Sequence, residues 1–512
     1  MEPQRLNPRG TARTTAAEVI AIRPGPPLTG TATVDGSKNA ALPLLAAAAV
    51  LRSPVRLSNL PDSTDVHVMI ALLREITSCV PAVTALQAAL GQASSVALRS
   101  EAEDLMAEAA EIWTRTTQAP PSALGHARSI LLSLKGTPRP EPTDQNAGYT
   151  MSIPQGPRTE AARGLGQLCL APDHYTTQVG EAILELAADP VGQIRHTTAK
   201  TAPFVARSDP DTAWKLLELL AQQESDDAVL SATVEAAGLR MGDRHRGTRL
   251  IAHIAARVNP SETPESATST CATVAALLWV YDAMPEARTL LDQMIGNWPG
   301  QSTWSSSLHI LRSQEALTHN DPAIRKRALD FMHELAEPTL RSAQEAIRRA
   351  DQLTDSEKKQ LKAELQLLDA IAFQLYSGSG AIDREATPLT SDQVRLVDEA
   401  DPVIQILAQV PAAPVTHHLV EIYEYVTDHR PQKALLTIRD IIKKAGTQDG
   451  YTMDPMGLGT CVKFVERILA DHRSILHTPE NLTALREICD VFIDAGRPQA
   501  HQLVFGIEQI FR

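Results

Sequence analysis

The sequence predicts a mainly α-helical fold, in which a helical-repeat array follows a small N-terminal α/β fragment. Apolar residues make up 43% of the 512 residues but aromatic residues only 4%, so alanine and leucine must fill most of the core. Such an interior favours helices packed on helices over sheets. From about residue 159 onward, apolar periodicity marks helices of about 12 to 18 residues separated by short breaks. Repeat arrays grow by adding units, so this length needs no division into several globular domains.

The N-terminal part has a mixed pattern. Asn39 is a good N-cap for the apolar helix that follows it. Pro43 falls in the first turn of that helix, where a proline costs little. We expect a loose tail over residues 1–16, then two short strands and two helices. The strands are predicted at 18–22 and 30–34, and the helices at 40–51 and 64–76.

Lys38 and Asn39 stand at the predicted start of the first helix. A cation, an amide and free backbone N–H groups meet there at the positive end of a helix dipole, which suits a phosphate or a carboxylate. A weak anion site is one interpretation. A capped core helix with an exposed lysine beside it is the other.

The motif residues of this part are similar to those of a known enzyme family. They are Leu28-Thr29-Gly30, Gly36-Ser37-Lys38-Asn39-Ala40-Ala41-Leu42-Pro43, Val55-Arg56-Leu57-Ser58-Asn59-Leu60-Pro61 and Asp65. The run from about 19 to 76 resembles the start of the enolpyruvyl transferases, and most closely the UDP-N-acetylglucosamine 1-carboxyvinyltransferases of peptidoglycan synthesis. The resemblance implies that Lys38 and Asn39 bind substrate, namely phosphoenolpyruvate and the amino-sugar nucleotide.

The resemblance to the enolpyruvyl transferases stops after Ile76. The family has two inside-out α/β domains, and its catalytic cysteine lies in a Gly-Cys loop that is followed by an Arg-Pro pair. The five cysteines of this chain lack that context and fall in or beside apolar helical patterns, where cysteine behaves as a small hydrophobe. They are Cys79, Cys169, Cys271, Cys461 and Cys489. We therefore predict no catalytic residue.

Charge and cysteine usage limit the classes of partner. The formal net charge is −13, which argues against general binding to nucleic acid or to an anionic membrane. A basic cluster is interpreted as a solvated helix end rather than a phosphate track: Arg240, Arg244, His245, Arg246 and Arg249. An odd number of cysteines without a CxxC pair indicates a reducing compartment. No apolar signal-like run is visible near Met1, so we expect a soluble, cytoplasmic protein.

Composition divides the rest of the chain. We predict an enolpyruvyl-transferase-like fragment over 17–78, a helical segment over 79–135 and a linker over 136–158, where prolines and glycines prevent a helix. The helical-repeat region is predicted over 159–512.

Four breaks between helices share a form. Each break contains an aspartate, which is followed directly by a proline in three of the four. An apolar residue comes a few positions later, and in two breaks an arginine follows that residue. The breaks are Asp189-Pro190, Asp226-Asp227, Asp321-Pro322 and Asp401-Pro402. We predict that an Asp caps the helix in each. The form resembles the inter-helix turn of HEAT repeats. Positions 189, 227, 321 and 401 are 38, 94 and 80 residues apart, near one, two and two periods of about 40 to 47. An irregular all-helical domain is the alternative.

Other patterns are weak. Gly457-Leu458-Gly459-Thr460 lacks the core of a phosphate loop and is interpreted as a helix start with a Thr cap. His417 and His418, like His472 and His477, have no carboxylate or cysteine at ligand spacing, so we expect surface or packing roles and no metal.

Two hypotheses of function follow. The first is a non-catalytic helical-repeat scaffold that binds an unknown protein partner, needs no cofactor and carries a truncated transferase-like N-terminus. The alternative is a phosphoenolpyruvate-dependent enolpyruvyl transferase of peptidoglycan precursor synthesis.

Overall fold

The structure is a computed structural model of the whole chain. It describes residue 66, parts of 103–115, and residues 121–137, 156–259, 266–297, 303–313, 315–383, 389–446, 451 and 455–496. The predicted tail, both predicted strands, the helix at 40–51 and all of the helix at 64–76 except Val66 lie outside these residues. A further helix that apolar periodicity predicts at 499–511 also lies outside them. Contacts divide the chain into two units, residues 1–82 and 83–512. Apart from the helical Val66, every described residue belongs to the second unit.

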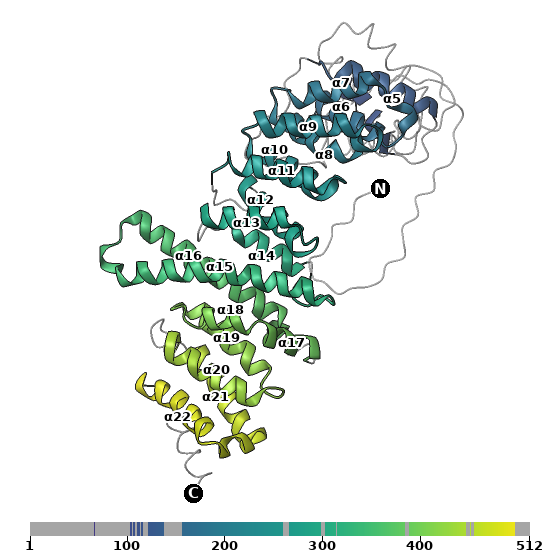
Figure 1. Cartoon of the computed structure of the whole chain (residues 1–512). Helices are drawn as coiled ribbons and strands as arrows, with labels where there is room; N and C mark the ends of the chain where they lie inside the picture. Colours follow the sequence, from purple (N-terminus) through teal and green to yellow (C-terminus); the bar gives the residue numbers. More distant parts are fainter. Residues whose placement is uncertain are drawn as a thin grey trace, which may run out of the picture. The chain divides into compact units, whose positions relative to one another are not determined.

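The described residues are helical, with turns and no strand among them (Figure 1). The α-helices are α5 (Pro121–Leu134), α6 (Pro157–Leu168), α7 (Thr177–Ala187), α8 (Gly192–Ser208), α9 (Pro210–Gln223), α10 (Asp227–Glu235), α11 (Arg244–Ala255), α12 (Ala267–Val280), α13 (Pro285–Asn297), α14 (Trp304–Ser313), α15 (Pro322–Arg348), α16 (Asp355–Gly378), α17 (Ser391–Glu399), α18 (Asp401–Leu407), α19 (Ala413–Tyr425), α20 (Pro431–Ile441), α21 (Pro455–Asp471) and α22 (Pro479–Asp494). Shorter helical turns between them include η2 (Ala236–Arg240), η5 (Ile442–Gly446) and η7 (Arg473–His477).

The helices pack in two layers. In one layer α6, α8, α10, α12, α14, α16, α19 and α21 each contact the next. The other layer contains α7, α9, α11 and α13, then the pairs α15 with α18 and α20 with α22. Neighbours in sequence join the layers, as α8 with α9, α12 with α13, α15 with α16 and α19 with α20. This arrangement confirms the predicted HEAT-like array, in which each pair of helices buries its apolar faces against the next.

Small side chains allow the helices to approach closely. Gly247 of α11 lies over η2, and a Cβ at this position would be 2.3 Å from the carbonyl oxygen of Ala237. The few large aromatic side chains fill the remaining space: Trp304 and Phe331, both fully buried, meet edge to face with ring centroids 6.0 Å apart. The core is therefore the one that the composition predicts, mainly alanine and branched aliphatic side chains with few aromatic residues.

Two of the four predicted Asp caps are confirmed. Oδ1 of Asp226 accepts hydrogen bonds from the backbone N–H groups of Ala228 and Val229, at 3.0 and 3.2 Å, at the start of α10. Oδ1 of Asp321 accepts from the N–H of Ala323 at 2.8 Å, with Pro322 as the first residue of α15. Both carboxylates satisfy N–H groups that have no partner within the helix.

The other two predicted caps are wrong. Asp189 accepts from the N–H of Val191 at 2.8 Å, but α8 begins only after Val191, and the carboxylate also binds Arg158 at 2.9 Å. Asp401 is the first residue of α18 rather than its cap, and its carboxylate lies 3.1 Å from Nζ of Lys433. In both cases the carboxylate pairs with a cation from another helix.

The cap at Asp321 can be tested by substitution. Asp321 is exposed, so its replacement by alanine removes the cap without opening a cavity. We expect Asp321→Ala to lower the free energy of unfolding by about 1 kcal/mol, and Asp321→Asn to be nearly neutral because asparagine caps as well as aspartate. Urea denaturation of both variants measures the difference. Equal losses for alanine and asparagine would contradict the cap.

Arg195 and Arg325, which follow the turns, make the same set of bonds. Nη1 of Arg195 donates to the carbonyl oxygens five and six residues earlier, at 3.1 and 2.8 Å, and its other nitrogens bind both oxygens of Glu224. Arg325 binds the carbonyls at the same offsets, at 3.3 and 2.7 Å, and both oxygens of Glu399 at 2.8 Å. The arginine of each Ile-Arg pair therefore links the turn before its helix to a glutamate from a later segment of the chain.

The helix before the predicted linker belongs to the array. Apolar periodicity predicts a helix at 123–134, and α5 forms at 121–134 and packs directly against α6. Most of the linker, residues 138–155, lies outside the described part of the chain, and the proposed domain boundaries remain a prediction.

Apolar periodicity predicts helices at 457–471 and 480–494, and α21 and α22 match these ranges within two residues. The predicted Thr cap near 460 is wrong. Helix α21 begins at Pro455, so Thr460 lies inside it, and its hydroxyl donates to buried Glu421 of α19 at 2.6 Å. Thr460 thus supplies a hydrogen-bond donor to the buried carboxylate of Glu421, which is why a threonine suits this position. No helix in the described ranges is both long and apolar enough to cross a bilayer.

Candidate functional site

The substrate-binding residues predicted by resemblance, Lys38 and Asn39, lie outside the described residues, so their roles remain a prediction. The described part of the chain offers its candidate sites in the helical array. Three features come from the sequence or the packing: the cysteines, the basic cluster and an open groove beside α20.

The four described cysteines are buried thiols, and Cys79 lies outside the described residues. Burial raises the pKa of Cys169 and Cys489 to about 12, and it raises the pKa of Cys271 and Cys461 as well. The thiolate is the nucleophilic form of cysteine, and these side chains are protonated at neutral pH. The prediction that they act as small hydrophobes agrees with this environment.

The basic cluster around α11 is largely neutralised by carboxylates of neighbouring helices. Arg246 binds Glu218 of α9 at 2.7 Å and lies 4.8 Å from the ring centroid of Trp214. Nδ1 of His245 lies 2.9 Å from Glu286 of α13. These contacts join α11 to α9 and α13 at the start of the helix, and whether the cluster binds phosphates remains a prediction.

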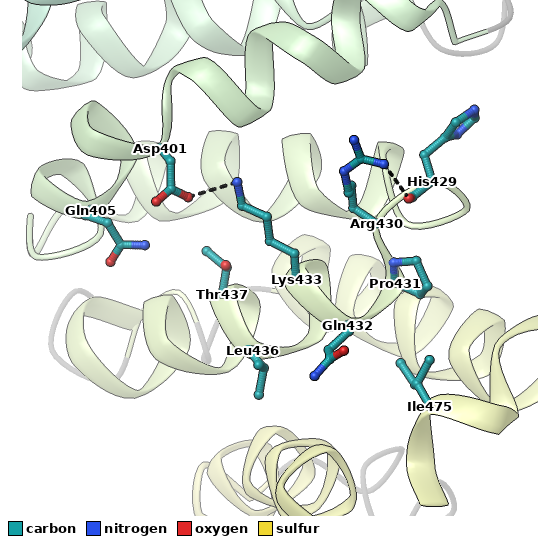
Figure 2. Close-up of a pocket in the computed structure, with 10 residues that line it drawn as sticks. All are labelled: Asp401, Gln405, His429, Arg430, Pro431, Gln432, Lys433, Leu436, Thr437 and Ile475. Atoms are coloured by element: carbon teal, nitrogen blue, oxygen red, sulfur yellow. Dashed lines mark hydrogen bonds and ion pairs between the residues drawn. The ribbon is translucent and has the colours of Figure 1, made fainter. Parts of the chain in front are cut away.

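An open groove of about 720 Å³ lies between the start of α18 and the start of α20 (Figure 2). We call it the α18–α20 groove. Figure 2 shows Gln405 at one end, His429 at the other, and Lys433 reaching across toward Asp401. The lining residues are Asp401, Gln405, His429, Arg430, Pro431, Gln432, Lys433, Leu436, Thr437 and Ile475.

The cations of the groove share two carboxylates. Arg430 binds Oδ2 of Asp398 through Nε at 3.1 Å and Nη2 at 2.9 Å. Nζ of Lys433 lies 3.3 Å from Asp398 and 3.1 Å from Asp401. All four side chains remain at least 30% exposed, so water reaches the pairs and weakens them.

The pKa of Asp398 depends on two opposing effects, its partial burial and the two cations beside it. Burial alone would raise it, but hydrogen bonds from Arg430 and Lys433, together with their positive charges, hold the pKa below its usual range. The carboxylate is therefore ionised at neutral pH, and the groove contains two cations matched by two anions. Leu436 and Ile475 add an apolar surface beside them. Such a mixed, open surface can exchange its ion pairs with side chains of a partner.

The histidines of α19 pack against aromatic rings. His418 stacks on Tyr376 with centroids 5.0 Å apart and meets Phe373 edge to face at 5.6 Å. Its Nε2 lies 3.5 Å from Asp369, but burial lowers the pKa of His418 to about 4 and raises that of Asp369. The imidazole is therefore neutral at pH 7, and the contact is not an ion pair.

A metal site needs several ligating side chains within reach of one ion. Among the described residues, no group of three histidine, cysteine, aspartate or glutamate side chains is placed to hold a metal ion.

Sequence reasoning missed the residues of the groove. Asp401 is singled out by its turn, but Asp398, Arg430 and Lys433 belong to no motif. The only signal is Arg430-Pro431, since proline at the first helical position marks a helix start. Which cations converge on Asp398 depends on the packing of α17, α18 and α20 and cannot be read from spacing.

Comparison with known sequences gives a match at the N-terminus. A family model described as EPSP synthase (3-phosphoshikimate 1-carboxyvinyltransferase) matches residues 22–104. UDP-N-acetylglucosamine 1-carboxyvinyltransferase of Desulfovibrio desulfuricans is 49% identical over 55 residues, which are 11% of this chain and 13% of that protein. The corresponding protein of Cellvibrio japonicus is 54% identical over 50 residues, 10% and 12% of the two chains.

These matches agree with the predicted resemblance. The chain thus spans about an eighth of the length of these relatives. The family match continues to residue 104, beyond the end at Ile76 that the motif residues predict.

Comparison with solved structures gives low similarity over most of the chain. Kap121p bound to Ste12p has a TM-score of 0.42 and 13% identity, covering 84% of this chain and 48% of that chain. Yeast importin-beta (Kap95p) has a TM-score of 0.32 and 13% identity, covering 93% and 65%.

The chain therefore combines a short segment of enolpyruvyl-transferase-like sequence at its N-terminus with a HEAT-like array of helices.

Proposed function

We propose that the protein is a non-catalytic helical-repeat scaffold that binds a protein partner through exposed faces of its helices. The observation that carries this proposal is the continuous packing from α6 to α22, in which helices such as α9, α13, α15 and α22 are buried on one side and expose the other to solvent. Arrays of this kind present extended surfaces that single globular domains of the same length lack.

The α18–α20 groove is the part of this surface best suited to a partner. Its ion pairs are exposed and shared, so an acidic side chain of a partner can replace Asp398 or Asp401 beside Arg430 and Lys433 at little net cost. The chain has a net charge of −13, so acidic residues outnumber basic ones. In this groove, however, a carboxylate of a partner would meet the cations Arg430 and Lys433.

Site-specific photo-crosslinking in cells tests the role. A photoreactive amino acid is placed at Gln405 in the groove or, as a matched control, at Gln222, an exposed glutamine of α9. We expect a discrete adduct from position 405, its loss in the Lys433→Glu background, and no adduct from position 222. Equal labelling from both positions, or none from the groove, would contradict the proposal.

The second candidate is an enolpyruvyl transferase, which is favoured by the sequence match over 22–104 with its Lys38-Asn39 pair. The reaction needs a placed general acid and several cations that stabilise charge in the transition state. Lys38, Asn39 and the helix start that the sequence predicts there would supply at best a weak anion site.

We therefore expect no detectable phosphate release when the full chain is incubated with phosphoenolpyruvate and UDP-N-acetylglucosamine. Turnover that disappears in Lys38→Ala would establish the enzyme instead of the scaffold.

A further inference from the structure

Helix α16 carries a row of side chains that are exposed or partly buried along most of its length. Seven side chains of this face follow a helical spacing that places them in one row, while Glu364, Leu368 and Leu375 are buried on other sides of the helix. The row spans about 27 Å at 1.5 Å per residue. We call it the α16 stripe: Lys358, Leu361, Lys362, Leu365, Asp369, Phe373 and Tyr376.

The first half of the stripe forms a cavity of about 380 Å³, which Ala412 and Pro414 border from the segment before and into α19. Leu361 and Leu365, one turn apart, are only partly buried and form its apolar surface. In a helical protein a pair of leucines at this spacing is normally covered by another helix. Here the packing of α16 on α15 and α19 leaves the pair partly open to solvent.

Two lysines flank these leucines. Lys362 is exposed and forms no ion pair with the described residues. Lys358 lies 3.6 Å from Asp355, a pair so exposed that it holds the lysine weakly. The carboxylate among the lining residues is Asp369, which is two turns beyond Leu361 and faces His418. The leucine pair thus has a positively charged rim in a chain whose net charge is −13.

The second half of the stripe is aromatic and held in place. Tyr376 stacks on His418, and the guanidinium of Arg312 lies 5.5 Å from the centroid of Phe373. Arg312 also donates to the hydroxyl of Ser377 at 3.0 Å. Aromatic side chains that are already fixed lose little entropy on binding, and such residues often supply most of the energy of an interface.

We propose that the α16 stripe is a docking surface for an acidic amphipathic helix of a partner protein. The inference rests on the proposed scaffold function but concerns a surface distinct from the α18–α20 groove. The apolar side chains of the partner cover Leu361, Leu365 and Phe373, and its carboxylates pair with Lys358 and Lys362. A stripe of about 27 Å accommodates about five turns of helix, and apolar residues at i, i+4 and i+7 give a partner helix the continuous apolar face that is needed to cover Leu361 and Leu365.

The chemistry favours this occupant over others. A nucleic acid requires a continuous basic track, and the stripe has two lysines followed by Asp369. An extended peptide would need an open backbone edge to pair with, which a helix does not offer. A basic helix would meet Lys358 and Lys362 with like charge.

Fluorescence anisotropy with defined peptides tests the proposal. The probe is a labelled 20-residue helical peptide with leucine at i, i+4 and i+7 spacing and glutamate on the remaining face, titrated with the full-length chain. We expect saturable binding that Lys362→Glu weakens by about tenfold or more through like-charge contact. The matched control is Lys215→Glu, the same charge change at an exposed position of α9, and it should leave the affinity within about twofold.

A second variant and a second peptide complete the test. Leu365→Glu should also abolish binding, while circular dichroism verifies its helix content. Because Lys362 is exposed, its variant keeps the test valid if Leu365→Glu does not fold. The same peptide with lysine in place of glutamate should not bind.

Several results would overturn the proposal: equal binding of the acidic and basic peptides, unchanged affinity in Lys362→Glu, or a dimer in sedimentation that Leu365→Glu abolishes, which would assign the stripe to a second copy. Adduct formation at Gln405 is measured separately from peptide binding to the α16 stripe. A failure of peptide binding therefore does not change the crosslinking result, and a failure of crosslinking does not change the peptide result.

Discussion

Replacing Arg195 by methionine is expected to lower the free energy of unfolding by about 3 kcal/mol or more. The side chain of Glu224 is only 4% exposed, and Arg195 is the cation that binds both of its oxygens, at 2.6 and 3.0 Å. Burial alone would raise the pKa of Glu224, but the bonds from Arg195 and from the N–H groups of Ser225 and Asp226 hold the pKa below its usual range. Methionine matches the length of arginine and leaves the buried carboxylate without its cation.

Two further variants test whether the loss of stability comes from the unpaired carboxylate of Glu224 or from any loss of an arginine. Arg195→Met combined with Glu224→Gln removes both charges and should recover a large part of the loss, because a neutral amide is cheaper to bury than an unpaired carboxylate. Arg341→Met breaks the exposed pair with Glu337, at 71% and 53% exposure, and should cost less than about 1 kcal/mol.

Hydrogen exchange is the appropriate measurement, because arrays of repeats do not always unfold in one step. It should show faster exchange in α8 and α10 in the single variant. Unchanged exchange in these helices would contradict the role of the pair.

Acidification from pH 7.5 to 4.5 is expected to destabilise the array through His196 and His418. Burial is the main cause that lowers the pKa of each to about 4, with Lys200 and His417 respectively acting in the same direction. The nearby carboxylates, Asp226 for His196 and Glu421 for His418, raise the pKa but do not compensate.

The sign follows from proton binding. Between about pH 6.5 and 4 the unfolded histidines bind protons and the folded ones do not, so stability falls as the pH falls. The full shift corresponds to about 3 kcal/mol for His196, which is 5% exposed, and to less for His418, whose side chain is 16% exposed. Asp369 acts in the opposite direction, since burial raises its pKa and the folded form gains protons more easily at low pH.

The pH dependence has its own control. The thermal midpoint of the full chain at pH 7.5 and 4.5 should show a smaller shift in His196→Asn and in His418→Phe than in the unaltered chain. His245, which is 64% exposed, is the matched control, and His245→Asn should leave the shift unchanged. A shift that persists in both buried variants would assign it to the carboxylates, whose titration begins nearer pH 4.5.

Local sequence was enough to predict the helices and some of their ends. The ranges of α5, α21 and α22, the caps at Asp226 and Asp321, and the Ile-Arg that follows two of the turns all depend on hydrogen bonds within a few residues. Composition predicted the helical core for a similar reason, since few aromatic residues and many alanines restrict how elements can pack.

The tertiary structure decided which partner each polar side chain found. Asp189 and Asp401 begin the same Asp-Pro-apolar pattern as the capping Asp321, yet arginine and lysine side chains of other helices bind them instead. Residues 30 or more apart meet in the α18–α20 groove, and the exposure of Leu361 and Leu365 depends on where α19 packs. A helix and its caps need only neighbouring residues, whereas the choice of ion pair and of open face is made by the packing of distant helices, which spacing within one segment does not encode.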